Sequence, residues 1–215
     1  MSGCGTCETC RSGCVHIDKF VDRVMANSAG APRHLVQDKV QETVQDFAGR
    51  TGIIKRVISF ETQACVDEYF LKPPCGELIQ SVDKVTDRDF YCPEAARERP
   101  CNDHLCQDLY FFERPCTLYI SPQPKCDGTK VYVEATMIPQ RDACEVDRRF
   151  FDYHSEAIVA GTIVEMASMS QSEWFAAGVV SSMQAKWEDK IDCAVAMKQR
   201  QFSRKPMRFR SGFII

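Results

Sequence analysis

The sequence predicts an α+β fold, in which N- and C-terminal helices form a bundle and a small antiparallel β unit lies in the middle of the chain. Apolar residues recur with a helical period near both ends, whereas the central part has short apolar runs separated by Pro, Gly and Asp. The order α, β, α favours this fold class. The predicted parts are a Cys-rich N-terminal arm (1–14), a domain over 15–200 with helices within 17–50 and 142–200 and the β unit at 52–139, and an extended basic and aromatic C-terminal arm (201–215).

The first helical segment predicts a hairpin of two helices. One apolar face carries Ile17, Phe20, Val21, Val24 and Met25, and the next carries Leu35, Val36, Val40, Val44 and Phe47. Gly30 and Pro32 lie in the intervening stretch SAGAP, where glycine can end one helix and proline can begin the next.

The central part predicts four strands. Their sequences are IIKRVISFE (53–61), GELIQSVDKV (76–85), CTLYIS (116–121) and TKVYVEATMI (129–138). The stretch PKCDGTK between the last two is typical of a hairpin turn. Residues 87–108 are polar and lack periodicity, so we expect a long loop there.

The second helical segment predicts two long helices. Asp142 precedes Glu145 by three residues, and Ser170 precedes Glu173 in the same way; this spacing is typical of a capping box at a helix start. Small residues at 157, 160 and 161 would let a neighbouring helix approach closely, so we expect these helices to pack on the N-terminal hairpin. We expect Trp174 and Trp187 to be buried.

Composition limits the function classes. The chain has 215 residues, of which 44 % are hydrophobic and 27 % charged, and its net charge is −3. This profile is typical of an ordinary folded protein and argues against nucleic-acid binding by bulk charge. Because we find neither a bilayer-spanning apolar stretch nor a signal peptide, we expect the chain to be made and folded in the cytosol, without a membrane partner. Its 13 cysteines are then expected mainly as thiols or metal ligands.

Four cysteines, Cys4, Cys7, Cys10 and Cys14, follow the spacing C-x2-C-x2-C-x3-C near the N-terminus. This run is typical of iron–sulfur ligation in bacterial ferredoxins. Val15 stands where such proteins have proline, and no second run exists, which argues against an electron carrier. Zinc or a single cluster acting as a structural staple, unligated thiols, and adventitious disulfides all stay open.

Catalytic motifs are absent from the sequence. The four histidines are scattered, and none belongs to a nucleophile or metalloprotease motif. The stretch CNDHLC (101–106) has no spacing typical of a zinc finger, and we interpret it as a polar surface loop. We therefore expect a protein that is not an enzyme.

The last eighteen residues, KQRQFSRKPMRFRSGFII, combine six basic residues with large apolar ones and have no acidic residue. A solvated tail does not normally keep so many large apolar side chains. We therefore expect an extended arm that binds a partner. The candidate contact residues are Arg200, Arg204, Lys205, Arg208, Phe209, Arg210, Phe213, Ile214 and Ile215.

Three stretches resemble the head-to-tail joining proteins of tailed phages, of the adaptor or tail tubular protein A type. They are FVDRVMANSAGAPRHLVQDKVQETVQDFAGRTGIIKR, EYFLKPPCGELIQSVDKV and YHSEAIVAGTIVEMASMSQSEWFAAGVVSSMQAKWEDKIDCA. The resemblance extends over residues 15–215. Trp187 stands where the family more often has Phe, and the Cys-rich arm has no counterpart in the family pattern.

The resemblance implies a structural virion protein of the head–tail junction, assembled in the host cytoplasm. Identical subunits, with twelve as the expected number, would form a ring under the portal protein and carry the tail tube or nozzle protein, while DNA passes through the channel. The C-terminal arm would then bind the portal. The alternative function is a metal- or iron–sulfur-binding accessory protein that uses the N-terminal cysteines.

Overall fold

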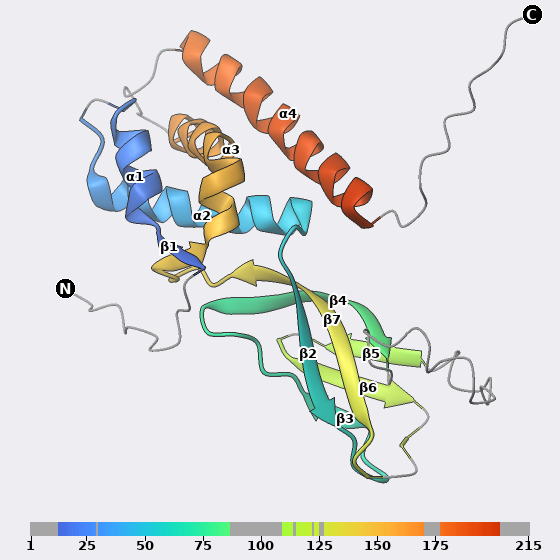
Figure 1. Cartoon of the computed structure of the whole chain (residues 1–215). Coiled ribbons are helices and arrows are strands. Elements are labelled where there is room, and N and C mark those ends of the chain that lie inside the picture. Colours follow the sequence, from blue (N-terminus) through green and yellow to red (C-terminus); the bar gives the residue numbers. More distant parts are fainter. Residues whose placement is uncertain are drawn as a thin grey trace, which may run out of the picture.

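The computed structural model describes residues 13–28, 30–86, 109–113, 115–121, 123–124, 127–169 and 177–202. Four helices lie in one half of the molecule and six strands project from it as the other half (Figure 1). The predicted α+β class, with antiparallel sheets, is confirmed. Within the described ranges, no helix combines the length and the apolar character needed to cross a bilayer.

The helices α1 (Asp18–Met25), α2 (Arg33–Thr51), α3 (Arg148–Ala167) and α4 (Ala177–Phe202) form what we call the helical region. Helix α3 contacts the other three helices, and α2 also contacts α1 and α4. Helices α1 and α4 lie on opposite sides of α3 (Figure 1). The two ends of the described chain therefore pack together, although more than a hundred residues separate α1 from α3.

Aromatic side chains fill the core of the helical region. Phe20, Phe47 and Phe150 are fully buried, and the Phe47 ring lies 5.7 Å from that of Trp187. Gly161 of α3 lies where a Cβ atom would come within 2.7 Å of Trp187 and 2.8 Å of Thr43. The expected close approach of helices at Gly161 and the burial of Trp187 are confirmed, whereas Trp174 lies outside the described residues.

Two three-stranded antiparallel sheets form what we call the β sandwich. One has the order β2-β7-β4, with β2 (Lys55–Glu61), β7 (Lys130–Pro139) and β4 (Glu77–Thr86); the other has the order β3-β6-β5, with β3 (Glu68–Phe70), β6 (Thr117–Ser121) and β5 (Leu109–Glu113). Phe60 of β2 stacks on Tyr69 of β3 at 4.5 Å between ring centroids. Leu118 and Val133 are fully buried.

The hairpin predicted at PKCDGTK is wrong. Strand β6 pairs with β3 and β5, while β7 pairs with β2 and β4, so this connection links the two sheets instead of two paired strands. Gly128 has a φ of +78°, which explains the turn signal without a hairpin. The expected loop at 87–108 lies outside the described residues.

A short two-stranded sheet corrects two of the predicted boundaries, the end of the N-terminal arm and the start of the third helix. Strand β1 (Cys14–His16) pairs with β8 (Glu145–Asp147), so Cys14 belongs to a strand and not to the irregular arm. The capping box expected at Asp142 is wrong, because helix α3 begins only after Asp147, whose side chain accepts a hydrogen bond from the Arg149 amide at 2.9 Å.

Candidate interaction surface at the junction

The helical region and the β sandwich meet where α2 runs into β2. Helix α2 ends at Gly52, whose φ of +55° is left-handed, and its amide donates to the Ala48 carbonyl at 2.8 Å. Two residues later the Met137 amide of β7 donates to the Ile54 carbonyl at 2.8 Å. The sandwich is therefore held directly against the C-terminal end of α2.

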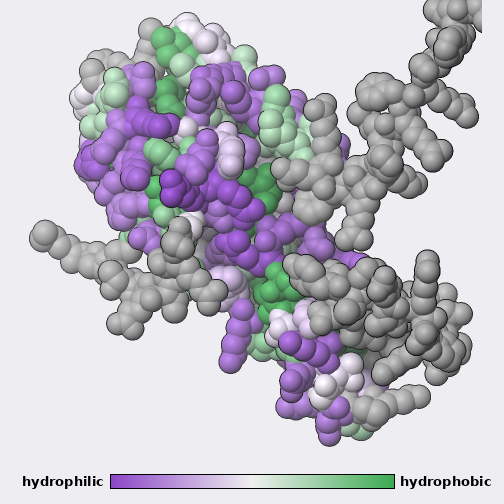
Figure 2. Space-filling model, in the orientation of Figure 1, coloured by the Kyte–Doolittle hydropathy of each residue, from purple (hydrophilic) through white to green (hydrophobic). Residues whose placement is uncertain are grey.

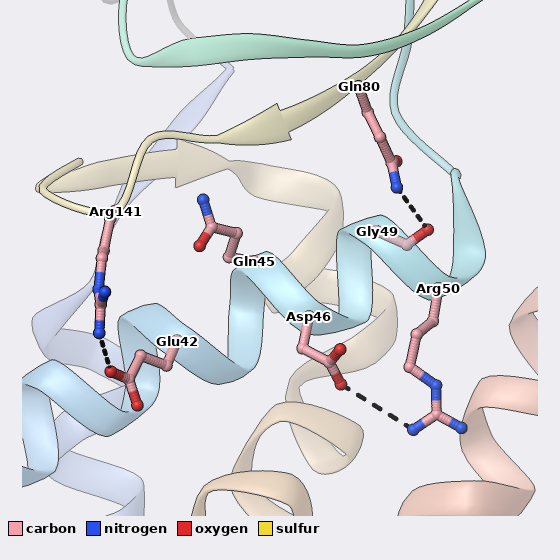
Figure 3. A pocket seen from close by; sticks show the side chains of 7 residues that line it. All are labelled: Glu42, Gln45, Asp46, Gly49, Arg50, Gln80 and Arg141. Carbon is pink, nitrogen blue, oxygen red and sulfur yellow. Dashed lines mark hydrogen bonds and ion pairs between the residues drawn. The ribbon is translucent and has the colours of Figure 1, made fainter.

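An open groove of about 580 Å³ follows the exposed side of α2 at this junction (Figure 3). The lining residues are Glu42, Gln45, Asp46, Gly49 and Arg50 of α2, Gln80 of β4, and Arg141 of the β7–β8 connection. Gln80 reaches down from the sheet and donates to the Gly49 carbonyl at 3.1 Å (Figure 3). Gln45 points the other way and donates to the Pro139 carbonyl at 3.1 Å.

Ion pairs line both ends of the groove. Arg141 pairs with Glu42, which also accepts from Lys39 at 2.6 Å. The hydrogen bond from Lys39, more than that from Arg141, lowers the pKa of Glu42. At the other end Arg50 pairs with Glu188 of α4 at 2.5 Å, and partial burial raises the pKa of Asp46. The groove is thus polar and locally charge-balanced, which suits a peptide segment better than a small apolar ligand.

A second ion-pair network crosses the junction beside the groove. The Arg56 guanidinium of β2 lies 2.7 Å from Glu77 of β4 and 3.0 Å from Asp147, the cap of α3. Asp147 also accepts from the Arg149 side chain. Burial opposes ionisation of Asp147, but hydrogen bonds from Arg149 and then Arg56 outweigh it and lower the pKa to about 2.

Sequence reasoning placed Arg56 in a strand but did not find this network. The sequence feature that could have indicated an ion-pair network is the pair of charged residues, Lys55 and Arg56, at the start of an otherwise apolar strand. Its partners lie 21 and 91 residues further along the chain, so only the fold brings them together.

Large apolar side chains are exposed on both parts of the molecule. Val57 of β2 is 57 % exposed, Phe70 of β3 is 66 % exposed, and Tyr153 of α3 is 77 % exposed. Most of the helical face seen in Figure 2 is hydrophilic, whereas a hydrophobic patch is visible toward the β sandwich. Scattered exposed apolar residues are normal on a monomer, so these three residues, none of which lines the groove, do not by themselves mark a contact surface.

Most of the residues predicted to bind the portal or a metal lie outside the described ranges. Arg200 belongs to the last turn of α4, which extends to Phe202, and positions 204–215 are not described. Cys14 is exposed and has a free thiol, while Cys4, Cys7 and Cys10 are not described. Among described residues, no three His, Cys, Asp or Glu side chains gather as metal ligands would.

The cysteines of the domain are not all thiols. Cys65 and Cys193 are exposed free thiols and Cys116 is a buried one, in agreement with the expectation that the cysteines are mainly thiols. Cys75 and Cys144, however, are disulfide-bonded. The expectation of a free thiol is therefore wrong at these two positions, both of which flank the junction.

Comparison with known proteins adds no identification: no protein-family model matches the sequence, and no curated protein matches it significantly. Any statement about function therefore depends on the sequence motifs and on the geometry of the junction.

Proposed function

We propose that this protein is a structural virion protein of a tailed phage, a head-to-tail adaptor whose subunits form a ring, with twelve as the expected number, under the portal. The observation that carries the proposal is the division of the chain: both ends of the domain lie in the helical region, and the β sandwich projects from it (Figure 1). A subunit with two separated faces can contact a neighbour and an axial partner at once, which ring closure requires.

The four helices would be the bundle of the adaptor type. The close helix approach at Gly161 and the contacts of α3 with α2 and α4 support this arrangement, because the resemblance extends through the same residues. The groove along α2 and the exposed apolar residues of the sandwich would serve contacts with neighbouring subunits and with the tail protein below. A structural role agrees with the expectation that the protein is not an enzyme.

The C-terminal arm would bind the portal. Helix α4 extends to Phe202 at the surface of the molecule, so the thirteen residues that follow begin where they can reach another subunit. Basic residues at 204, 205, 208 and 210 would mainly speed docking, and apolar residues at 209 and 213–215 would mainly slow release.

The test uses the full chain and the portal ring of the phage that encodes it. Size-exclusion chromatography followed by negative-stain imaging should give a portal ring with a second ring beneath it. A variant that ends at Phe202, the last residue of α4, should elute apart from the portal.

Two arm variants separate the roles of charge and apolar surface. Gln at the four basic positions should slow association, and Ser at the four apolar positions should speed dissociation, both measured by surface plasmon resonance. A substitution of exposed Tyr153 by Ser serves as the control away from the arm. Absence of any complex between the full chain and the portal ring overturns the proposal.

A further inference from the structure

Strand β2 lies at an edge of its sheet, since it pairs with β7 on one side and with no described strand on the other (Figure 1). The Met137 amide donates to the Ile54 carbonyl, and the Thr62 amide donates to the Thr129 carbonyl, at the two ends of the β2–β7 ladder. Bonded and non-bonded positions alternate along an antiparallel ladder. The backbone N–H and C=O groups of residues 54, 56, 58, 60 and 62 therefore point toward β7, whereas those of residues 55, 57, 59 and 61 point away from it.

The outward backbone groups of Val57, Ser59 and Glu61 have no hydrogen-bond partner in the part of the chain that the structure describes. All three residues are exposed. A row of unpaired N–H and C=O groups along a strand is a template on which a further strand can pair.

The two edges of this sheet differ in how well they could accept another strand. Strand β4, at the opposite edge, has two register shifts against β7 and exposes the charged residues Asp83 and Lys84. Such irregularities and charges usually protect an edge from pairing. Strand β2 pairs with β7 over seven consecutive residues without a shift, and residues 57–60 contain neither a charge nor a proline. The edge at β2 is therefore the one suited to pairing.

Opposite charges at the two ends of β2 indicate which strand fits there. Lys55 begins the strand and Glu61 ends it. If β2 pairs antiparallel with β2 of a second copy and is centred on Ile58, Lys55 of each copy lies opposite Glu61 of the other, and Val57 lies opposite Ser59. Outward residues then face outward residues, as the backbone hydrogen bonds require. Parallel pairing in register would instead place like charges side by side, which is unfavourable.

We propose that β2 is a dimerisation edge, at which two copies of this chain pair antiparallel about a two-fold axis at Ile58. The pairing would join two three-stranded sheets into one continuous sheet. Ile58 packs against the hydrophobic core, so its contact with Ile58 of the second copy would extend the core of the sandwich across the axis. An identical strand supplies both sides of such an isologous contact.

The fold leaves room for this arrangement. Strand β2 begins beside the helical region and runs toward the far end of the sandwich, so antiparallel pairing places the two helical regions at opposite ends (Figure 1). Lys55 already lies 2.8 Å from Glu134 and 3.1 Å from Asp83 of its own chain. Backbone hydrogen bonds therefore supply most of the affinity, and the contact between Lys55 and Glu61 mainly selects the register. The inference does not depend on the proposed ring, which requires heterologous contacts instead.

The first experiment measures self-association of the full chain without any portal protein. Free thiols are blocked with N-ethylmaleimide, so that exposed cysteines do not link copies, and sedimentation velocity is recorded over a wide concentration range. We expect a reversible monomer–dimer equilibrium. Glu61→Lys should raise the dissociation constant about tenfold, because Lys55 then faces a cation at both ends of the pairing. Glu68→Lys, at an exposed position of β3, is the matched control and should leave it unchanged.

A cysteine substitution tests the register. Ile58 and its copy would form a non-hydrogen-bonded pair with Cα atoms about 4.5 Å apart, within the reach of a disulfide. Ile58→Cys should therefore link two copies in oxidised glutathione. In Ser59→Cys, the matched control, the two sulfurs belong to diagonal positions about 7–8 Å apart at their Cα atoms, so the yield should be much lower. Trypsin and a glutamate-specific protease release residues 57–61, which contain no natural cysteine, as one peptide whose linked pair mass spectrometry identifies.

Hydrogen exchange shows whether the edge is open in the monomer. The Val57 and Ser59 amides should be protected at high protein concentration and should exchange fast at low concentration. Equal protection at both concentrations would mean that another segment of the same chain covers the edge, and this result overturns the proposal. A chain that stays monomeric, or a Ser59→Cys variant that links as readily as Ile58→Cys, overturns it as well. Sedimentation and exchange of the unmodified chain need no variant, so a misfolded variant does not prevent the decision.

Discussion

The helical region and the β sandwich are stabilised differently. The three fully buried phenylalanines, at 20, 47 and 150, all lie in the helical region, together with Ile158, Ile163 and Met166. Among the described residues of the sandwich strands, no aromatic side chain is fully buried, and the largest fully buried ones are Leu118 and Met137. Side-chain packing therefore dominates the helical region, whereas the sandwich depends more on backbone pairing and on its attachment to α2 and α3.

This difference predicts that the sandwich opens at lower free energy than the helices. Hydrogen exchange reports the two parts separately, because amides in each cooperative unit exchange with the free energy of that unit.

Trp187→Ala should have the largest effect. Trp187 is 7 % exposed, contacts the Phe47 ring and lies against Gly161, so truncation leaves a cavity between α2, α3 and α4. We expect the free energy of unfolding to fall by about 3–5 kcal/mol. Tyr153→Ala, at a 77 % exposed site on α3, should change it by less than about 0.5 kcal/mol. Equal melting of both variants and the parent would show that the helical core does not depend on Trp187.

Gly161→Ala should destabilise the same region by about 1–3 kcal/mol, because the new methyl group overlaps Trp187 and Thr43. Gly178→Ala is the matched control. That glycine also lies in a helix, but nothing approaches its Cβ position within 4 Å, so alanine should stabilise α4 by up to about 1 kcal/mol. Opposite signs in chemical denaturation are the expected result; stabilisation by both substitutions contradicts the tight helix contact.

The junction network should give the protein an acid-sensitive component. The pKa of Asp147 is about 2 in the folded protein and near 3.8 when unfolded, so ionised Asp147 favours folding. This contribution, about 2 kcal/mol, is present above the unfolded pKa and is lost as pH falls through the folded pKa.

Asp147→Asn should remove that part of the pH dependence between about pH 5 and pH 2, as measured by urea denaturation. Asp152→Asn, at an exposed pair with Arg148, controls for the loss of a carboxylate. The comparison between variants is needed because Glu42, Glu156 and Glu188 also have lowered pKa values. Parallel acid profiles for both variants would argue against the role of the network.

Tyr69→Phe should have the smallest effect and should act on the sandwich alone. The Tyr69 hydroxyl donates to the Val66 carbonyl at 2.8 Å and accepts from the Gln63 amide at 3.2 Å. Loss of these bonds should cost about 1 kcal/mol and increase exchange in β3 and β6 first. Tyr119→Phe removes an exposed hydroxyl bonded to Glu113 and should change little. Increased exchange in the helical amides as well would mean that the two parts unfold together.

Local periodicity predicted the long elements well. The strands expected at 53–61, 76–85, 116–121 and 129–138 correspond to β2, β4, β6 and β7, and the four expected helices exist with shifted ends. These segments carry enough residues for a period to be visible. Strands β1, β3 and β8 have three residues each, too few for a pattern, and they depend on partners that the chain order does not reveal.

The junction between the helical region and the β sandwich was less predictable, because its contacts also depend on partners that the chain order does not reveal. Asp142 and Glu145 have the spacing of a cap, but pairing of β8 with β1 keeps this stretch extended and moves the cap to Asp147. The cysteines were expected mainly as thiols or metal ligands, and their spacing does not reveal that Cys75 shares a pocket with Cys14. Motifs report residues close in sequence, whereas this junction is assembled from distant ones.

The pairing of β2 with β7 makes the β sandwich an insertion into the chain of the helical region, because the inserted segment begins and ends at neighbouring points. The chain leaves the helices at Lys55 and returns at Thr136, and these two residues lie opposite each other in neighbouring strands. Paired antiparallel residues are only about 5 Å apart at their Cα atoms. Recombination could therefore lengthen, shorten or exchange the eighty residues between them without moving the ends that the helices must meet, so the projecting part can diversify while the helical part is inherited unchanged.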